Sequence, residues 1–227
     1  MLWRIVRING DGTIRLIANK SIGTSAFGNK QNEEKKVGYT YDNEVACTNK
    51  NLCDTNIDTD STIKTYLDNW YNKNLNNYNK LIATTTYFND TSIVSTDGNN
   101  KYYGSYDRLV TNKKPQFKCP NTTETYGGTY NLKVGLLSAD EVAFAGGVSE
   151  SNNSNYYLNR TKYYWLSSPY NYNNYAGGHC VNDNGSIGHA GVHSTVADEV
   201  VPVINLKKDI IYNFGNGEKS SPYVLSY

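Results

Sequence analysis

The first eighteen residues alternate apolar and polar positions around a central turn. Residues 2–8 read LWRIVRI, residues 13–18 read TIRLIA, and NGDG lies between them. A period of two is typical of half-buried strands, and an Asn/Gly-rich break between two such runs favours a β-hairpin. We therefore predict a hairpin whose second strand places Ile14, Leu16 and Ala18 on one face.

Residues 58–75 have the spacing of an amphipathic helix. Apolar side chains recur there at i, i+3, i+4 and i+7, at Ile63, Tyr66, Leu67 and Trp70. This stripe predicts Trp70 in the core, with Asp60 or Ser61 as the N-cap.

A second, shorter helix is predicted within GLLSADEVAFAGG, residues 135–147. Ser138 and Glu141 have the spacing of a capping box, and Leu137 and Val142 that of a hydrophobic staple. Gly146 and Gly147 then end the helix. A catalytic carboxylate pair is the alternative for Asp140 and Glu141, but capping accounts for both residues.

The remaining segments are read as loops and strands. Residues 19–59 are polar and Gly-punctuated, which predicts loops with one short strand, and residues 85–130 predict a long excursion of loops and short strands. Strands are predicted in KYYWLSS (162–168), in EVVPVINL (199–206), where Pro202 indicates an edge or a bulge, and in SPYVLSY (221–227). Residues 178–192 predict a hairpin that turns at Asn184-Gly185. Terminal strands that pair, with both helices packed on one side, make an α+β layer fold.

The amino-acid composition and net charge limit the kinds of partner and location that we expect for this protein. The 227 residues include 21 tyrosines and carry a net charge of +1, so no partnership with nucleic acid is expected. No apolar run reaches 18 residues and a strand pattern follows Met1 at once, so we expect no membrane insertion and no signal peptide. The chain is then a mature fragment, a domain of a longer protein, or a cytosolic protein. The abundance of Asn and Tyr fits either an AT-rich genome or a contact surface.

The four cysteines allow two interpretations of their oxidation state. Cys47 and Cys53 have a spacing that allows a small disulfide loop, whereas reduced, partly buried thiols are the alternative for all four, including Cys119 and Cys180. No CxxC half-site is present, so zinc is not expected.

Several short sequence segments together resemble those of a known family. They are LWRIVRINGDGTIRLI, STIKTYLDNWYNKNL, PQFKCP, GLLSADEVAFAGG, YYWLSSP, VNDNGSIG and VVPVINL. They resemble a family of uncharacterised bacterial domains, common in gut Firmicutes, with WRIVRINGDG early and GVRPVINL late. That family is similar to the C-type lectin-like fold, in the branch shared with formylglycine-generating enzyme and the variable proteins of diversity-generating retroelements. The resemblance implies one C-type lectin-like domain over residues 1–227, alone or as a fragment of a longer surface protein, in an extracellular or cell-surface location.

Two departures from the family pattern matter. Val201 stands where the family has arginine before Pro202, and the stretch Tyr87-Phe88-Asn89-Asp90 lacks the cysteine that members carry in YFCND. If that cysteine normally pairs with the one in PQFKCP, Cys119 lacks its partner here.

The resemblance also indicates where a ligand would bind, because C-type lectin-like folds display ligand surfaces on loops of the C-terminal half. The stretch YNYNNYAGGH (170–179) is expected to be such an exposed loop. We expect a non-catalytic binding module for glycan or protein, without catalytic residue, metal or cofactor, since Tyr rings stack and Asn amides hydrogen-bond. The candidate contacts are Tyr170, Tyr172, Asn173, Asn174, Tyr175, His179, Asn182, Asp183 and His189.

Other functions compete with this one. A structural module of a larger surface protein would need no ligand, and diversified loops would be a variant of the binding function. An oxidoreductase like formylglycine-generating enzyme would need a close cysteine pair late in the chain, where only Cys180 occurs. A metal site from His189 and His193 with Asp198 or Glu199 would require a helix, which Gly191 disfavours. EPN and QPD, the tripeptides of calcium lectin sites, are missing from the chain.

Overall fold

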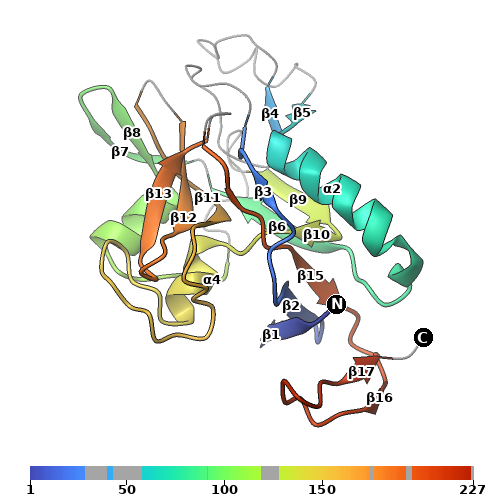
Figure 1. The fold of residues 1–227 in the computed structure, drawn as a ribbon. Helices are drawn as coiled ribbons and strands as arrows, with labels where there is room; N and C mark the ends of the chain where they lie inside the picture. Colours follow the sequence, from blue (N-terminus) through green and yellow to red (C-terminus); the bar gives the residue numbers. More distant parts are fainter. Residues whose placement is uncertain are drawn as a thin grey trace.

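Strands dominate the computed structural model, which is mixed α/β with few, short helices (Figure 1). The structure describes residues 1–28, 40–42, 58–90, 92–118, 128–173, 176–192 and 196–225. Within these ranges most strands fall into two sheets, of four and seven strands. The α+β expectation is met at this level.

The four-stranded sheet joins the beginning of the chain to its end. Its order is β1 (Trp3–Ile8), β2 (Ile14–Ala18), β15 (Val203–Leu206) and β10 (Val134–Gly135), with antiparallel pairing throughout. The predicted hairpin is confirmed, and its turn closes with a 2.8 Å hydrogen bond from the Asn9 amide to the Thr13 carbonyl. The hairpin pairs with a strand near the other terminus, as expected.

The two main helices lie on opposite faces of this sheet, so the expectation that both pack on one side is wrong. Leu16 packs in the core that contains Ile63 of α2 (Thr62–Asn74), whereas its neighbour Ile17 packs in the core that contains Val142 of α4 (Ala139–Phe144). Successive strand residues point to opposite faces, so a strand buried on both faces supplies two cores. Ala18 joins Ile17 in the second core and does not share a core with Leu16.

Helix α2 begins as predicted but buries a slightly different stripe. The Ser61 hydroxyl accepts a hydrogen bond from the Lys64 amide at 3.3 Å, so Ser61 is the N-cap. The buried positions are Ile63, Leu67 and Tyr71. Trp70 is only partly buried and lies at the rim against Trp3, with ring centroids 6.4 Å apart, so its predicted place in the core is wrong.

Helix α4 carries the predicted capping box. The Ser138 hydroxyl accepts from the Glu141 amide at 3.1 Å, and the Glu141 carboxylate accepts from the Ser138 amide at 2.9 Å. Leu137 and Val142 pack in the same core, as a hydrophobic staple requires.

Capping is only part of the role of the two acidic residues. Glu141 is buried and forms ion pairs with Arg7, at 2.6 Å, and with Arg15. Asp140, fully buried, holds the Arg108 guanidinium with two bonds of 2.9 and 3.0 Å. The acidic start of α4 therefore ties the N-terminal hairpin and the segment around Arg108 to one helix.

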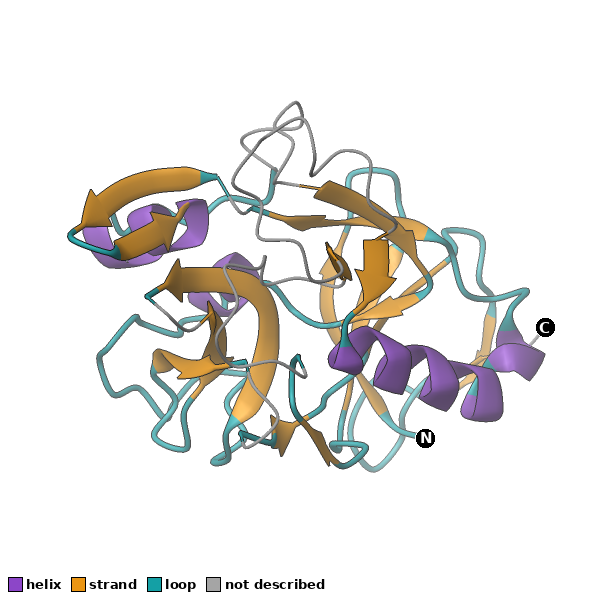
Figure 2. Ribbon diagram, turned by 90° about the horizontal axis from the view of Figure 1, so that it is seen from above, coloured by secondary structure: helices purple, strands orange, loops and turns teal. Residues whose placement is uncertain are grey.

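The seven-stranded sheet combines strands β11 to β14 with β3 and the β7–β8 ribbon (Figures 1 and 2). Its main path runs β13 (Ile187–Gly191), β12 (Ala176–Val181), β11 (Tyr164–Tyr172), β14 (Asp198–Glu199) and β3 (Thr24–Ser25). Strand β8 (Asn100–Tyr103) pairs with both β11 and β7 (Ile93–Asp97). The predicted hairpin is confirmed as β12–β13.

The predicted strand over EVVPVINL is interrupted. Glu199 ends β14 in the seven-stranded sheet, and Val203 begins β15 in the other sheet. Pro202 lacks an amide donor and lies between them, while its carbonyl accepts from the Ala18 amide at 2.9 Å. Proline thus marks a crossing between sheets, neither an edge nor a bulge.

The middle of the chain is more regular than predicted. After β8 come a short helical turn, α3 (Gly104–Tyr106), and a π-helical segment, η2 (Asp107–Thr111). The other elements are the strand pairs β4 (Thr40–Asp42) with β5 (Asp58–Asp60), β6 (Thr85–Asn89) with β9 (Gly128–Leu132) and β16 (Tyr212–Phe214) with β17 (Val224–Leu225), and the 3₁₀ turn η1 (Asn76–Tyr78). Strand β17 confirms the last predicted strand.

Candidate functional site

Three predicted contact residues meet on one face of the seven-stranded sheet. His179 of β12 and His189 of β13 are directly opposed in the antiparallel register, so their side chains share a face. Tyr170, on the next strand β11, stacks on His189 with centroids 3.9 Å apart and planes 3° apart. It also meets His179 edge-on at 5.0 Å. These three rings form one packed unit.

Two further tyrosines extend this unit. Tyr106 of α3 contacts Tyr170 edge-on at 5.3 Å, and Tyr102 of β8 lies tilted against Tyr106, with ring centroids 4.1 Å apart and planes 32° apart. Strand pairing of Tyr102 with Asn171 fixes β8, and a hydrogen bond from the Ser105 hydroxyl to the Pro169 carbonyl fixes α3. The Tyr–His platform is therefore defined as Tyr102, Tyr106, Tyr170, His179 and His189.

A carboxylate reaches the platform from a turn with unusual backbone geometry. Glu150 has a φ of +58°, a left-handed conformation that is uncommon for a residue other than glycine. Its amide donates to the Ile187 carbonyl at 3.1 Å, and Glu150 raises the pKa of the Tyr170 hydroxyl. The turn thus places an exposed carboxyl group beside the start of β13.

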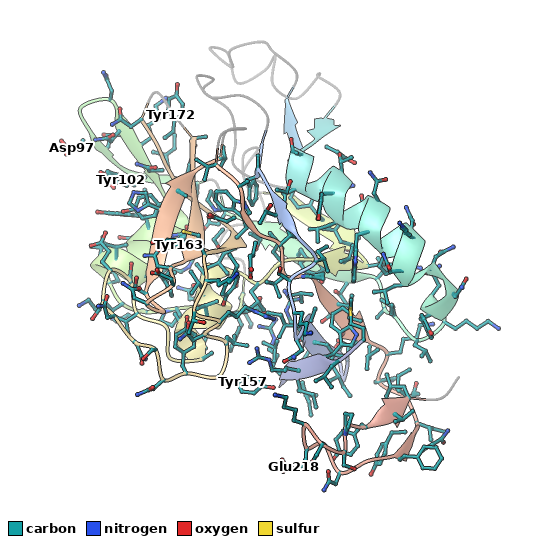
Figure 3. All side chains as sticks on the ribbon, viewed as in Figure 1. Asp97, Tyr102, Tyr157, Tyr163, Tyr172 and Glu218 are labelled. Carbon is teal, nitrogen blue, oxygen red and sulfur yellow. The ribbon has the colours of Figure 1, made fainter. Side chains whose placement is uncertain are left out.

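Asp97 adds a second negative charge near the same place. It ends β7, in the tight turn to β8, and Figure 3 shows Asp97, Tyr102 and Tyr172 at one end of the molecule. Burial raises the pKa of the Tyr106 hydroxyl, and the charges of Glu150 and Asp97 raise it further. The pKa of Tyr170 is likewise raised, by burial and by Glu150. Both phenols therefore stay protonated at neutral pH.

His179 is the most buried member of the platform. Its exposed fraction is zero, and Nδ1 lies 3.2 Å from the Gly188 carbonyl, so Nδ1 carries the proton and donates it. Burial lowers the pKa of His179 to about 3, and the nearby His189 and Arg108 act in the same direction. The imidazole is therefore neutral, and its buried Nε2 is an acceptor without a hydrogen-bond partner among the described residues.

The other predicted contacts lie away from the platform. Asn182 and Asp183 occupy the closed end of the β12–β13 hairpin, where Asn182 donates to the Ser186 hydroxyl at 2.8 Å and so stabilises the turn. Tyr172 ends β11 and packs against the first core, while Asn173 is exposed. Asn174 and Tyr175 lie outside the described residues.

The predicted exposed loop over residues 170–179 is mostly strand, so that prediction is wrong. Tyr170 is only 6% exposed and His179 is fully buried, because β11 continues to Tyr172 and β12 begins at Ala176. Of the predicted contacts on the platform, His189 alone is exposed.

Three residues of the site were not predicted from sequence, namely Tyr102, Tyr106 and Glu150. The signal for the tyrosines was the stretch KYYGSYD, residues 101–107, which carries three tyrosines within five positions. Glu150 had no comparable signal, since it reaches Tyr170 only through the folding of a distant turn.

No metal-binding site is found in the part of the chain that the structure describes. No group of three His, Cys, Asp or Glu side chains there could hold a metal ion. His189 lies on a strand, so the spacing to His193 does not place both on one helical face, and His193 is outside the described ranges. No helix among the described residues is long and apolar enough to cross a membrane.

Cys180 is a free, buried thiol, whereas Cys47, Cys53 and Cys119 lie outside the described residues, so the choice between a Cys47–Cys53 disulfide and reduced thiols is not tested. Burial, together with the charge of Asp198, raises the pKa of the Cys180 thiol to about 12.

We expect Cys180 to resist alkylation in the native protein, because the reactive species is the thiolate. Iodoacetamide at pH 8 should label Cys180 only after denaturation, as read by peptide mass spectrometry. Rapid native labelling of Cys180 would contradict the buried placement of β12.

The arrangement offers packed aromatic rings whose accessible edges carry hydroxyl, imidazole and carboxylate groups. Such a surface can stack on a ligand and hydrogen-bond to it. Comparison with known proteins adds no constraint, since no family model, no curated protein and no solved structure matches the chain.

Proposed function

We propose that this chain is a non-catalytic binding module that presents the Tyr–His platform for glycan or protein recognition at the bacterial surface. The observation that carries the proposal is the convergence of five rings from β8, α3, β11, β12 and β13 on one face. Tyrosine rings give large contact areas at low entropic cost, and their hydroxyls add directional hydrogen bonds.

The proposal includes a C-type lectin-like fold. Two observations support it. The N-terminal hairpin pairs with β15 near the other terminus, and strands β11, β12 and β13 of the C-terminal half carry three of the five platform residues. In that fold the paired terminal strands form a rigid scaffold that holds the ligand-binding surface. We propose the same arrangement for this chain.

A structural role is the second candidate, and a specific observation favours it. Tyr170 and His179 are buried, and His179 hydrogen-bonds to Gly188, as residues that only support a fold would do. If the role is only structural, replacing the exposed His189 and the half-buried Tyr106 should not abolish binding to any external ligand.

A glycan array together with a surface-protein binding screen tests the two candidates. We expect the native domain to bind a ligand and a Tyr106→Leu/His189→Ala variant to lose most of that binding, because these side chains border the platform at its accessible side. Tyr163→Ala is the matched control, since Tyr163 is 48% exposed just before β11 begins, at the strand's other end from Tyr170 (Figure 3). Circular dichroism melting of all three proteins separates loss of binding from loss of fold.

Equal binding by the native domain and the platform variant would overturn the proposed site. Absence of binding by the native domain to every ligand in both screens would favour the structural module.

A further inference from the structure

Exposed apolar side chains gather at the end of the molecule that carries β1 and the β16–β17 ribbon (Figure 1). Only the base of this ribbon, at Ile210 and Leu225, packs against the core that contains Leu16 and Ile63. A two-stranded ribbon is marginally stable by itself in water. Its outer side chains are nevertheless apolar and 44–70% exposed, namely Ile211, Tyr212, Phe214, Tyr223 and Val224.

Strand β1 continues this apolar surface along the edge of the four-stranded sheet. A bulge between Ile5 and Arg7 shifts the register, so that Ile5 opposes Leu16 and Ile8 opposes Ile14. Directly opposed residues share a face, and Leu16 and Ile14 face the same core as the base of the ribbon. Ile5 and Ile8, 48% and 70% exposed, therefore lie on that face too. These two residues and the five of the ribbon are called the apolar end patch.

The outer edge of β1 is open to another strand. β1 is the last strand in the order of its sheet, and among the described residues only β2 pairs with it. Charged side chains commonly protect such an edge. Here they serve the opposite face, since Arg7 pairs with Glu141 and Arg4 donates to the Tyr157 carbonyl at 2.7 Å. The face that carries Ile5 and Ile8 has no such protection from β1 itself.

The apolar end patch is large enough to form a stable interface. A fully buried aromatic side chain removes about 200 Å² from water, and an aliphatic one about 100 Å². At the observed exposed fractions the patch presents about 600 Å² of apolar surface. A homodimer interface of standard size buries about 800 Å² on each partner, of which about 65%, or about 500 Å², is apolar. The patch therefore meets the area that a dimer needs.

The charges beside the patch favour a second copy of the chain over a charged partner. Three lysines and two carboxylates lie along residues 207–219, at Lys207, Lys208, Asp209, Glu218 and Lys219. This near balance leaves little repulsion between two identical surfaces, and it gives nucleic acid or an anionic lipid surface no strong attraction.

We propose that the chain forms a two-fold dimer, in which β1 of one copy pairs antiparallel with β1 of the other beside the two ribbons. Antiparallel pairing of identical strands brings the same residues together from both sides, so the contact closes at two copies and does not grow into a fibre. The inference goes beyond the proposed function and does not depend on it, because the platform strands β8, β11, β12 and β13 belong to the other sheet.

Analytical ultracentrifugation of the whole chain over a series of concentrations is the test. We expect a reversible change from 25.4 kDa to twice that mass, with a dissociation constant on the order of micromolar or tighter, as interfaces of this size have. Hydrogen exchange followed by mass spectrometry, below and above that concentration, should show additional protection of the β1 amides in the dimer.

Two variants locate the interface. Ile8→Lys places a charge on the open edge, where the two-fold axis would bring two such charges together. Phe214→Ser removes an aromatic anchor from the ribbon. Each should weaken dimerisation at least about tenfold, and melting curves verify that each variant folds. Ile93→Ser is the matched control, because Ile93 is 53% exposed on β7 of the other ribbon and should leave dimerisation unchanged.

Every outcome decides the inference. A monomer at all concentrations would overturn it, and so would assembly beyond two copies, which a closed two-fold contact does not allow. Dimerisation that survives both Ile8→Lys and Phe214→Ser, or that leaves the β1 amides unprotected, would place the interface elsewhere and overturn it as well. Loss of the dimer in both variants, with the Ile93→Ser dimer intact, supports it. The ligand screens test the platform separately, so either proposal can fail alone.

Discussion

Glu141→Ala should destabilise the folded chain by about 3–5 kcal/mol, the usual cost of removing one partner from a buried ion pair. Glu141 is 4% exposed, and its carboxylate pairs with Arg7 and Arg15. Arg15 is itself 5% exposed, and two of its guanidinium nitrogens contact the Glu141 carboxylate. In the variant Arg15 stays charged but loses that carboxylate. Loss of the capping box would add to the cost. Urea denaturation at pH 7 measures the change.

A double variant tests whether the uncompensated charge is the cause. Glu141→Leu with Arg15→Met removes the more deeply buried of the two ion pairs of Glu141, while the charge of Arg7, whose side chain is 29% exposed, can be solvated by water. Well-packed apolar replacements of buried ion pairs are often close to neutral. We therefore expect the double variant to be more stable than Glu141→Ala by at least about 1–2 kcal/mol. Glu218→Ala, at an exposed position, should change stability by less than about 0.5 kcal/mol. A double variant no more stable than Glu141→Ala would show that the cap, and not the charge, determines the cost.

These ion pairs show what could be predicted from sequence and what could not. The capping box of Ser138 and Glu141 is a local pattern, since its partners are three residues apart, and it was predicted correctly. The pairing of Glu141 with Arg15 joins residues 126 positions apart, and no local pattern encodes it. The N-terminal hairpin and the N-cap of α2 were predictable for the same reason as the capping box.

The candidate site was predicted only in part because it depends on strand register. The Asn and Gly residues in the stretch 170–179 favoured a loop by local propensity. Pairing of β11 with β12 and β8 overrode that propensity. The register then brought Tyr170, His179 and His189 together and drew in Tyr102, which lies 68 positions before Tyr170. The exposure and the partners of these residues depend on tertiary structure and could not be predicted from local sequence.

The fully buried His179 should make the fold sensitive to acid. Its pKa is lowered from 6.5 to about 3 in the folded chain by burial, by the nearby His189 and by Arg108. Between these values the unfolded chain binds a proton that the folded chain does not, so protons favour unfolding. Stability from this group is complete above pH 6.5 and is lost as the pH falls from 6.5 toward 3.

The size of the effect follows from the same linkage. Each pH unit inside the window costs up to about 1.4 kcal/mol, so this group alone should remove about 2–3 kcal/mol between pH 6.5 and pH 4.5. His179→Gln removes the titration and keeps an amide that can donate to Gly188, so its urea midpoint should fall less over that range. His189→Gln is the matched control, because His189 is exposed and its lowered pKa is partly offset by Glu150.

NMR gives the direct measurement of the His179 pKa. The Cε1 proton of His179 should keep the chemical shift of neutral imidazole down to pH 4.5, while an unfolded reference titrates near 6.5. Titration of His179 near pH 6.5 in the folded chain would contradict its complete burial within the platform.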